Sequence, residues 1–391
     1  IQTINLTDEE KAAGKYTLAG LQPTSTYTIT IYKNDVKRGQ LQITTPAAMP
    51  AANYKYSLSS DVTVISQTLI DEIAEQAKAA AGNETNYSAT IGIPAGAKVA
   101  LYGTNDTDGG KTNVTIPDGM SVTFFGLAGG ETPTITLDKN FDVAGSHAFI
   151  KFQNVKLEEN GAGYFINQSK ACTVGEFTLE DCEVSNIKTS FFRFQGSDAK
   201  SVGKLTLKNS IFTNLCAGYG FIHIDAKNGA GHLDNVEIDG CTFNSICVTG
   251  KVFIYSNKKD MQDITIKNST FYNCNGNGQY FVDFGKDAKF GPNTFTIESC
   301  IFGKSADEKT DKNIRSKTPA TVANSFRTTD FFKVIKGVID TEFSSEQLFT
   351  DPANGNFTIK AGTLKEKAGD PRWYVCLLYT SPSPRDVEES R

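Results

Sequence analysis

The sequence predicts an all-β chain whose main part is a right-handed parallel β-helix with three-strand coils of about 28–31 residues. Two observations predict this fold. A strand-and-turn motif recurs at nearly constant spacing, and a second row of apolar residues recurs 30 positions apart. A fixed period in this range is typical of solenoids, in which each repeat packs only on its neighbours.

The recurring motif combines a short strand with a sharp bend. In each copy two apolar residues flank a polar one, as in a strand with one buried face. A residue that tolerates a tight turn follows, and an apolar residue comes three positions later. The clearest copies begin at Phe177, Leu205, Val236, Ile264 and Phe295, with spacings of 28, 31, 28 and 31 residues. We expect the closing residues to stack in one internal column, formed by Val184, Phe212, Phe243, Phe271 and Phe302.

A second strand of each coil is indicated by apolar residues 30 positions apart. The first interior row would be Phe192, Ile222, Val252 and Val282, and the next would be Phe194, Ile224, Ile254 and Phe284. Because side chains alternate along a strand, the residues between these rows should face outward. Residues 55–373 are therefore predicted to form the β-helix.

One strong helix is predicted, from Ser66 to Ala81. Ser66 is a suitable N-cap, and the apolar residues that follow recur at helical spacing. A solenoid needs its first coil covered, so we interpret this helix as the cap of the β-helix.

The cysteines are interpreted as buried thiols and not as a disulfide framework. Cys182, Cys241 and Cys300 share one column but lie two coils apart, or about 9.6 Å. That separation exceeds the roughly 7 Å Cα limit for a disulfide. A bridge among Cys216, Cys247 and Cys274 is left open, and nothing in the sequence indicates one.

The first 45 residues carry alternating strands at 15–18, 27–32 and 39–44. The segment from Leu21 to Tyr27 resembles the tyrosine corner of fibronectin type III domains, whose tyrosine bonds back to the upstream backbone. The resemblance implies that residues 1–45 are the C-terminal part of such a β-sandwich, truncated at its N-terminus. Residues 46–54, with two prolines, are interpreted as a linker.

The predicted helix, the segment Thr90–Gly96 and the repeat with Asn at its sharp turn together resemble the pectate-lyase-like superfamily. The segments Leu348–Ile359 and Gly369–Trp373 resemble secreted Bacteroidetes lipoproteins that carry a β-helix of unknown function after a fibronectin-type module. The resemblance implies an extracellular or outer-membrane surface location. Residues 374–391 look like translated sequencing-adapter sequence, and we interpret them as a non-native tail.

Composition excludes several classes of partner. A net charge of -5 with 21% charged residues argues against nucleic acid, whose phosphates need a basic surface. No run of about 20 apolar residues could span a membrane. The segment Gly103–Gly110 has the composition of a calcium loop but lacks the twelfth-position Glu, so we interpret it as a turn and expect no cofactor or metal. We expect a monomer.

The resemblance implies that substrate lies along the outer face of one parallel sheet, and the strand at residues 191–195 and its equivalents would supply that face. Aromatic rings there would stack on sugars, and polar groups would bond hydroxyls or uronate carboxylates. Polysaccharide is therefore the expected partner. The substrate-binding residues would be Phe165, Asn167, Phe191, Gln195, Phe221, Lys251, Phe253, Tyr255 and Phe281.

Three alternatives remain at this stage. The chain could be a polysaccharide lyase, in which Arg193 neutralises a uronate carboxylate, His223 is the base and Asp225 or Asp283 orients it. It could be a structural or adhesive spacer that binds no sugar. In addition, a loop or the segment 305–373 could cover the outer face and bury its aromatic residues.

Overall fold

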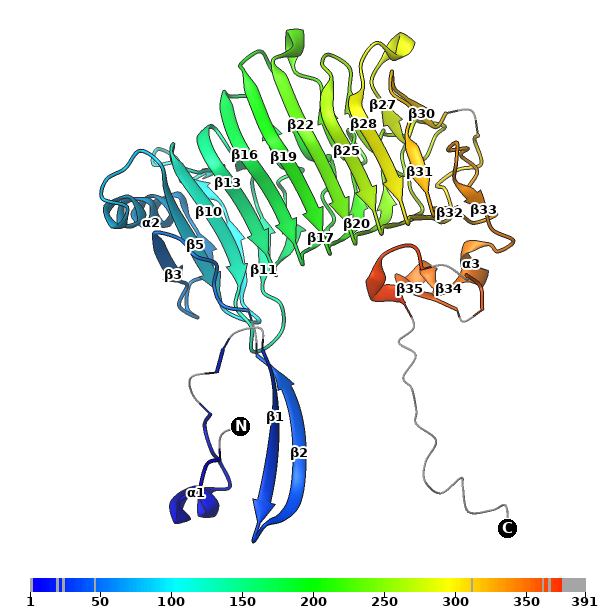
Figure 1. Ribbon diagram of the computed structural model, residues 1–391. Coiled ribbons are helices and arrows are strands. Elements are labelled where there is room, and N and C mark those ends of the chain that lie inside the picture. Colours follow the sequence, from blue (N-terminus) through cyan, green and yellow to red (C-terminus); the bar gives the residue numbers. More distant parts are fainter. Residues whose placement is uncertain are drawn as a thin grey trace, which may run out of the picture.

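The computed structural model describes residues 3–18, 21–22, 25–45, 47–310, 312–360, 362–364 and 367–374. From Tyr54 onward the chain winds into a parallel β-helix, and Figure 1 shows its coils stacked side by side. The predicted all-β solenoid is confirmed. A complete coil contributes one strand to each of three parallel sheets, which we name the ten-stranded, eleven-stranded and eight-stranded sheets, and the terminal coils contribute to fewer.

The ten-stranded sheet contains most of the longer strands. It consists of β3 (Tyr54–Ser57), β5 (Tyr87–Ile93), β10 (Met120–Gly126), β13 (Gly145–Gln153), β16 (Cys172–Glu180), β19 (Lys200–Lys208), β22 (Gly231–Asp239), β25 (Met261–Lys267), β28 (Pro292–Glu298) and β31 (Thr321–Ala323). The repeated motif of the sequence supplies these strands from β16 to β28. The sharp bend follows each of them, at Asp181, Asn209, Gly240, Asn268 and Ser299, all with left-handed backbone.

The other two sheets contain shorter strands. The eleven-stranded sheet consists of β4 (Val64–Ile65), β6 (Lys98–Leu101), β11 (Thr134–Leu137), β14 (Lys156–Glu159), β17 (Glu183–Ser185), β20 (Ile211–Leu215), β23 (Thr242–Ile246), β26 (Thr270–Tyr272), β29 (Ile301–Phe302), β32 (Phe326–Arg327) and β33 (Ile339–Asp340). The eight-stranded sheet consists of β9 (Val114–Thr115), β12 (Phe141–Asp142), β15 (Tyr164–Gln168), β18 (Ser190–Phe194), β21 (Ile222–Ile224), β24 (Ile254–Ser256), β27 (Val282–Asp283) and β30 (Ile314–Arg315).

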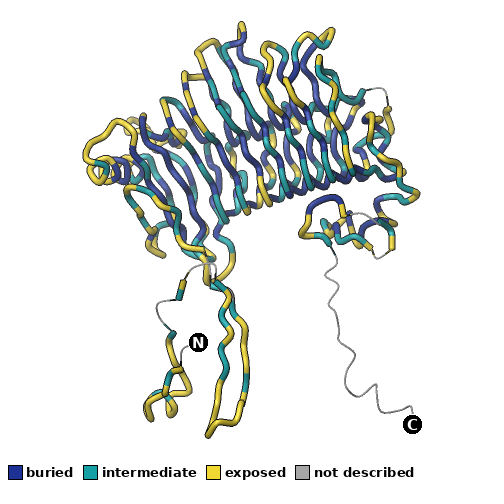
Figure 2. The backbone as a smooth tube through the Cα atoms, viewed as in Figure 1, coloured by how far each residue is buried: buried dark blue, intermediate teal, exposed yellow. Residues whose placement is uncertain are grey.

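The interior is held by two parallel columns of phenylalanine rings, within the dark-blue core of Figure 2. The predicted column is present: Phe212, Phe243, Phe271 and Phe302 stack with centroids 4.8–5.1 Å apart. The second column packs edge-on against the first at 5.0–5.6 Å. Both offset stacking and edge-to-face packing are favourable arrangements of aromatic rings. The second column consists of Phe165, Phe191, Phe221, Phe253 and Phe281.

The predicted cap is α2 (Gln67–Ala80), which lies at the first coils of the β-helix (Figure 1). The Ser66 hydroxyl accepts a hydrogen bond from the Leu69 amide at 3.2 Å and satisfies one of the free donors of the first turn. The apolar stripe buries Ile70, Ile73 and Ala77 against the first coils. The helix therefore shields the open end of the solenoid core.

The N-terminal segment contains α1 (Asp8–Ala13) and a hairpin of β1 (Thr26–Lys33) and β2 (Val36–Thr44). The strand predicted at residues 15–18 is wrong, because those residues follow α1 without pairing. The Gln22 amide donates to the Tyr27 hydroxyl at 2.7 Å, which is the contact expected of a tyrosine corner. One hairpin does not make a β-sandwich, so the fibronectin type III assignment and its boundaries stay predictions.

The C-terminal segment packs on the outside of the last coils. It consists of α3 (Ser345–Leu348), an antiparallel pair of β34 (Phe349–Asp351) and β35 (Asn356–Ile359), and a 3-10 turn, η4 (Pro371–Trp373). Phe349 and Phe357 form a small second core with Tyr272 and Ile301 of the eleven-stranded sheet. The Trp373 indole donates to the Thr242 hydroxyl at 2.7 Å. Of the predicted non-native tail, residues 375–391 lie outside the described residues.

Candidate functional site

The outer face of the eight-stranded sheet presents a continuous polar row, one residue from each of six successive coils. Strand pairing places each residue directly beside the next. We call these residues the polar row: Asn167, Arg193, His223, Tyr255, Asp283 and Arg315. At a strand spacing of about 4.8 Å, the row extends roughly 24 Å along the solenoid axis.

The five phenylalanines predicted on this face are not there. Phe165, Phe191, Phe221, Phe253 and Phe281 are fully buried or nearly so, and they form the second aromatic column of the core. A side chain inside the solenoid cannot touch a ligand outside it. The aromatic platform predicted from these residues is therefore wrong.

The reason is the geometry of the corner before each short strand. In-and-out alternation begins only at Phe192, which faces inward and is followed by Arg193 facing outward and Phe194 facing inward. Phe191 lies near the start of β18, and Phe221, Phe253 and Phe281 directly precede their strands. At each of these positions two consecutive residues both point into the core. Strands of two to five residues are too short to extend alternation past such a corner.

The predicted interior row also contains one register error. Phe192, Ile222 and Val282 do lie in one row, but the third member is Ile254, not Val252. The coil between Ile222 and Ile254 carries two extra residues, which the next coil removes again. Phe253 consequently stacks inside on Phe221, with centroids 4.9 Å apart, instead of facing outward.

Arg193, His223 and Asp225 come together, as predicted. Arg193 holds Asp225 through two hydrogen bonds, Nε–Oδ1 at 3.2 Å and Nη2–Oδ2 at 2.7 Å. Its guanidinium also lies 3.7 Å from the ring centroid of Tyr219. Burial opposes ionisation of Asp225, but hydrogen bonds from His223 and Arg193 outweigh it, and the pKa of Asp225 is lowered. Arg193 is thus already neutralised by a carboxylate within the protein.

His223 lies against two tyrosine rings, stacked on Tyr255 and tilted by 56° relative to Tyr219. Its ring lies 4.6 Å from that of Tyr255 and 5.1 Å from that of Tyr219. Nδ1 accepts a hydrogen bond from the Gly220 amide at 3.3 Å, which leaves the proton on Nε2, 3.6 Å from Asp225 Oδ2. Both ring nitrogens are engaged, so the imidazole is held in one orientation.

Asp283 does not join the Arg193 cluster, because it lies two strands away along the row. It pairs with Arg315 through two hydrogen bonds of 2.7 Å. Arg315 in turn lies 4.4 Å from the centroid of the Tyr280 ring, and the pair with Asp283 raises the pKa of Arg315. Sequence reasoning missed Arg315 because the repeat signal fades after Phe302, and it missed Tyr280 because this residue lies outside the strands, just before β27.

The two ends of the row therefore repeat one arrangement: an arginine, a bidentate aspartate and a tyrosine ring. Between them stand His223 and Tyr255. Burial, and then the charge of Asp283, raises the pKa of Tyr255 and keeps its hydroxyl protonated. Tyr164 adds a ring 6.4 Å from that of Tyr219 at the first end.

The remaining predicted residues lie at the edges of this face. Asn167 is the half-buried first member of the row, beside Arg193. Gln195 directly follows β18, and Lys251 lies in the turn before β24, both half-buried. The covering alternative supposed that a loop or the segment 305–373 buries the aromatic residues, but the five phenylalanines are buried because they point into the core. Within that segment, α3 to η4 pack on the eleven-stranded sheet, and β30 adds Arg315 to the polar row.

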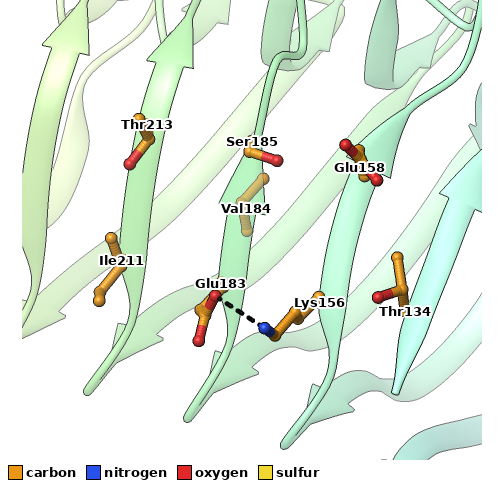
Figure 3. Close-up of a pocket in the computed structure, with 8 residues that line it drawn as sticks. All are labelled: Thr134, Lys156, Glu158, Glu183, Val184, Ser185, Ile211 and Thr213. Carbon is orange, nitrogen blue, oxygen red and sulfur yellow. Dashed lines mark ion pairs between the residues drawn. The ribbon is translucent and has the colours of Figure 1, made fainter. Parts of the chain in front are cut away.

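Two surface hollows in the described part of the chain lie away from this face. Figure 3 shows a depression of about 170 Å³ on the eleven-stranded sheet, where Lys156 and Glu183 form an ion pair of 3.5 Å. It is a gap between outward side chains and is smaller than usual ligand sites. A hollow of about 460 Å³ lies between Tyr272, the loop 304–308 and Glu346. Its Asp330 accepts hydrogen bonds from Ser345 and is thereby used to hold α3.

The segment resembling a calcium loop forms a small hairpin of β7 (Gly103–Thr104) and β8 (Lys111–Thr112). The Asp108 carboxylate accepts the Gly110 amide at 2.8 Å and so closes the turn. Within the described residues, no three His, Cys, Asp or Glu side chains are grouped so that they could hold a metal ion. No helix in that part of the chain is long and apolar enough to cross a membrane.

Comparison with known proteins adds a partial match. A family model described as a domain of unknown function (DUF5123) matches residues 264–373, less than a third of the chain. The matched range covers β25 to η4, so it contains Asp283, Arg315 and the C-terminal segment but not Arg193 or His223. No curated protein and no solved structure matches the chain.

Proposed function

We propose that this protein binds polysaccharide along the outer face of the eight-stranded sheet. The observation that carries the proposal is the polar row itself. It is a line of planar and hydrogen-bonding groups. Three of its members, Arg193, His223 and Arg315, lie against tyrosine rings, and a fourth, Tyr255, is itself a tyrosine. Tyrosine and histidine present both an apolar face and a polar edge, which suits sugars, because sugars also have apolar faces and hydroxyl edges.

The charges of the row favour a neutral glycan over a uronic acid polymer. Arg193 is paired with Asp225 and Arg315 with Asp283, so the four charged groups cancel. A uronate carboxylate could take the bidentate position on either arginine only by displacing the aspartate that already balances its charge. Breaking such a buried pair costs several kcal/mol. Sugar hydroxyls, in contrast, can bond the outer edges of these groups without breaking the pairs.

Affinity gel electrophoresis tests the proposal, using a panel of neutral and uronic-acid polysaccharides cast into native gels. We expect retardation by one or more neutral polysaccharides and a roughly tenfold weaker apparent affinity for Tyr255→Ala, since one lost stacking partner is worth about 1 kcal/mol or slightly more. Tyr32→Ala is the matched control, because Tyr32 is an exposed tyrosine of the N-terminal hairpin. If no glycan retards the protein, or if Tyr255→Ala binds as the wild type does, the proposal fails.

A polysaccharide lyase is the second candidate, favoured by one observation: Arg193, His223 and Asp225 converge as elimination chemistry requires. Two features weigh against it. Arg193 is neutralised internally, and neither nitrogen of His223 has an open lone pair when Nδ1 accepts the Gly220 amide. Incubation with uronic-acid polymers decides the question, because a lyase would release unsaturated ends that absorb ultraviolet light and His223→Gln would abolish that release. Without binding or release, the spacer interpretation stands.

The location and the finer family assignment belong to the same proposal. The resemblance to pectate-lyase-like proteins and to secreted Bacteroidetes lipoproteins implies a chain outside the cytoplasm, where polysaccharide is available. Protease treatment of intact source cells tests this part separately: a surface protein is cleaved while a cytoplasmic marker survives.

A further inference from the structure

Two cysteines occupy equivalent positions in consecutive coils. Cys216 directly follows β20 and Cys247 directly follows β23, and the last residues of these strands, Leu215 and Ile246, are paired. The Cys247 amide donates to the Leu215 carbonyl at 3.0 Å, which keeps this register past the strand ends. Neighbouring coils are about 4.8 Å apart, inside the 4.4–6.8 Å range of Cα separations found in disulfides.

The backbone at both cysteines is unusual for this residue type. Cys216 has a φ of 69° and Cys247 a φ of 58°, in the left-handed region. Among the described residues, most other non-glycine positions with positive φ carry Asn or Asp, which adopt this conformation more readily. Cysteine offers no such advantage. Its presence at two stacked left-handed positions points to a use for the thiols.

The two side chains also meet. Both are fully buried free thiols in this structure, and they interact with each other; Cys247 Sγ also lies 3.6 Å from the Val252 carbonyl. Cys274, in the next coil, is aligned with Ile246 and not with Cys247. Cys274 is therefore out of register with the other two cysteines.

The other cysteine column provides an internal contrast. Cys182, Cys241 and Cys300 alternate with serines, whose hydroxyls accept the cysteine amides at 3.1–3.2 Å. These cysteines are two coils apart and cannot bridge. Cys216 and Cys247, in contrast, lie in consecutive coils, with no other coil between them.

We propose that Cys216 and Cys247 form a disulfide that joins two consecutive coils when the chain folds in an oxidising environment. The oxidant is a small-molecule or protein disulfide. One cysteine thiolate attacks it, releasing one thiol, and the second cysteine then attacks the mixed disulfide and releases the other thiol. Two protein thiols are oxidised while one external disulfide is reduced to two thiols.

The bond must form before the coils close. Burial, and then the neighbouring Cys216, raises the pKa of Cys247 well above its ordinary value, so the folded chain holds no reactive thiolate there. Each cysteine also begins the turn that leads to β21 or β24, the strands that carry His223 and Tyr255. The bond would tie these two turns together, although its formation does not depend on glycan binding.

Refolding the full chain with a mixture of oxidised and reduced glutathione tests the proposal. We expect six of the eight cysteines to titrate in denaturant and one disulfide-linked peptide pair, containing Cys216 and Cys247, to appear by mass spectrometry after digestion. Reduction before heating should lower the midpoint of thermal unfolding by about 4 °C, because a loop of roughly 30 residues is released.

Two variants make the test specific. Cys274→Ser should keep the linked peptide, and Cys247→Ser should lose it and titrate seven thiols. If Cys247→Ser does not fold, peptide mapping of the wild type and of Cys274→Ser still shows whether Cys216 and Cys247 are linked. Eight titratable thiols after oxidative refolding, or a link between Cys247 and Cys274, would overturn the proposal.

Discussion

The outer faces of the ten-stranded and eight-stranded sheets are built on the same coil spacing but carry different chemistry. On the ten-stranded sheet, flexible lysines reach glutamates of a neighbouring coil through single contacts. Examples are Lys151–Glu176 and Lys208–Glu180, each at 2.8 Å, with the Lys208 side chain about half exposed. On the eight-stranded sheet, planar arginines hold aspartates through two bonds each, and the Arg193 side chain is only 10% exposed.

This difference is our reason for proposing the eight-stranded face, and not the ten-stranded face, as the binding face. Exposed lysine–glutamate pairs contribute little to stability, since water and salt compete with them. Bidentate pairs covered by aromatic rings are rigid, and removal of one partner leaves the charge of the other desolvated and unpaired. A rigid row of planar groups is a costly arrangement for mere solubility, and we infer that this cost is tolerated for binding.

The largest loss of folding stability should come from a substitution of Phe253, a buried member of the second aromatic column. Phe253→Ala removes a ring stacked on Phe221 and Phe281, and we expect it to lower the free energy of unfolding by about 3–5 kcal/mol. Urea denaturation followed by circular dichroism measures this. Val252→Ala is the control, because Val252 is half-buried in the turn. If both variants lost an equally small amount of unfolding free energy, Phe253 would have to lie on the surface, and its assignment to the core would be wrong.

Arg193→Met should have the next largest effect. It leaves Asp225 partly buried without its main partner, so we expect a loss of about 2–4 kcal/mol in the free energy of unfolding. The double variant Arg193→Met with Asp225→Leu should recover part of that loss, since the unpaired carboxylate of Asp225 is then removed as well. Absence of any coupling in this double-mutant cycle would mean that the pair is no stronger than a surface pair.

Acid should weaken the eight-stranded face through Asp225. Its folded-state pKa is lowered from 3.8, so its contribution is complete well above pH 3.8 and is lost as pH falls through the folded-state value. The stability difference between wild type and Asp225→Asn, about 1–2 kcal/mol near neutral pH, should therefore shrink below about pH 4. Denaturation curves at several pH values measure it. A difference that grows on acidification would reverse the assigned sign.

The smallest effect is expected on the ten-stranded face. Lys208→Met removes the single contact to Glu180 and should change the free energy of unfolding by less than about 0.5 kcal/mol. The same denaturation experiment measures it, and added salt should leave the variant and the wild type alike. A loss comparable with that of Arg193→Met would remove the contrast between the two faces.

Much of the interior could be predicted because residues one repeat apart in the sequence lie directly above one another in the stacked coils. The column of Phe212, Phe243 and Phe271 follows directly from the motif spacing, and its rings lie where expected. The separation of Cys182 from Cys241 follows by the same reasoning, and both are free thiols. The helix at α2 is encoded locally, by the Ser66 cap and an apolar stripe.

The candidate site was only partly predictable. Arg193, His223, Tyr255 and Asp283 were correctly placed outward, since alternation holds inside each strand. Phe191 and its equivalents were misplaced because they lie near or just before the start of their strands, where two consecutive side chains point inward and alternation has not yet begun. Arg315 was missed because the repeat signal fades after Phe302, and its role exists only through Asp283, 32 residues earlier.

The sequence by itself determined the solenoid, its capping helix and the phenylalanine column, because these depend on period, local capping and burial, all of which are written along the chain. Only the tertiary structure decided how many residues each corner absorbs. That count sets which neighbour a side chain meets in the next coil, and hence the charge pairs of the polar row and the meeting of Cys216 with Cys247. Contacts between coils depend on where corners fall, and a corner can gain or lose two residues without disturbing the apolar pattern on either side of it.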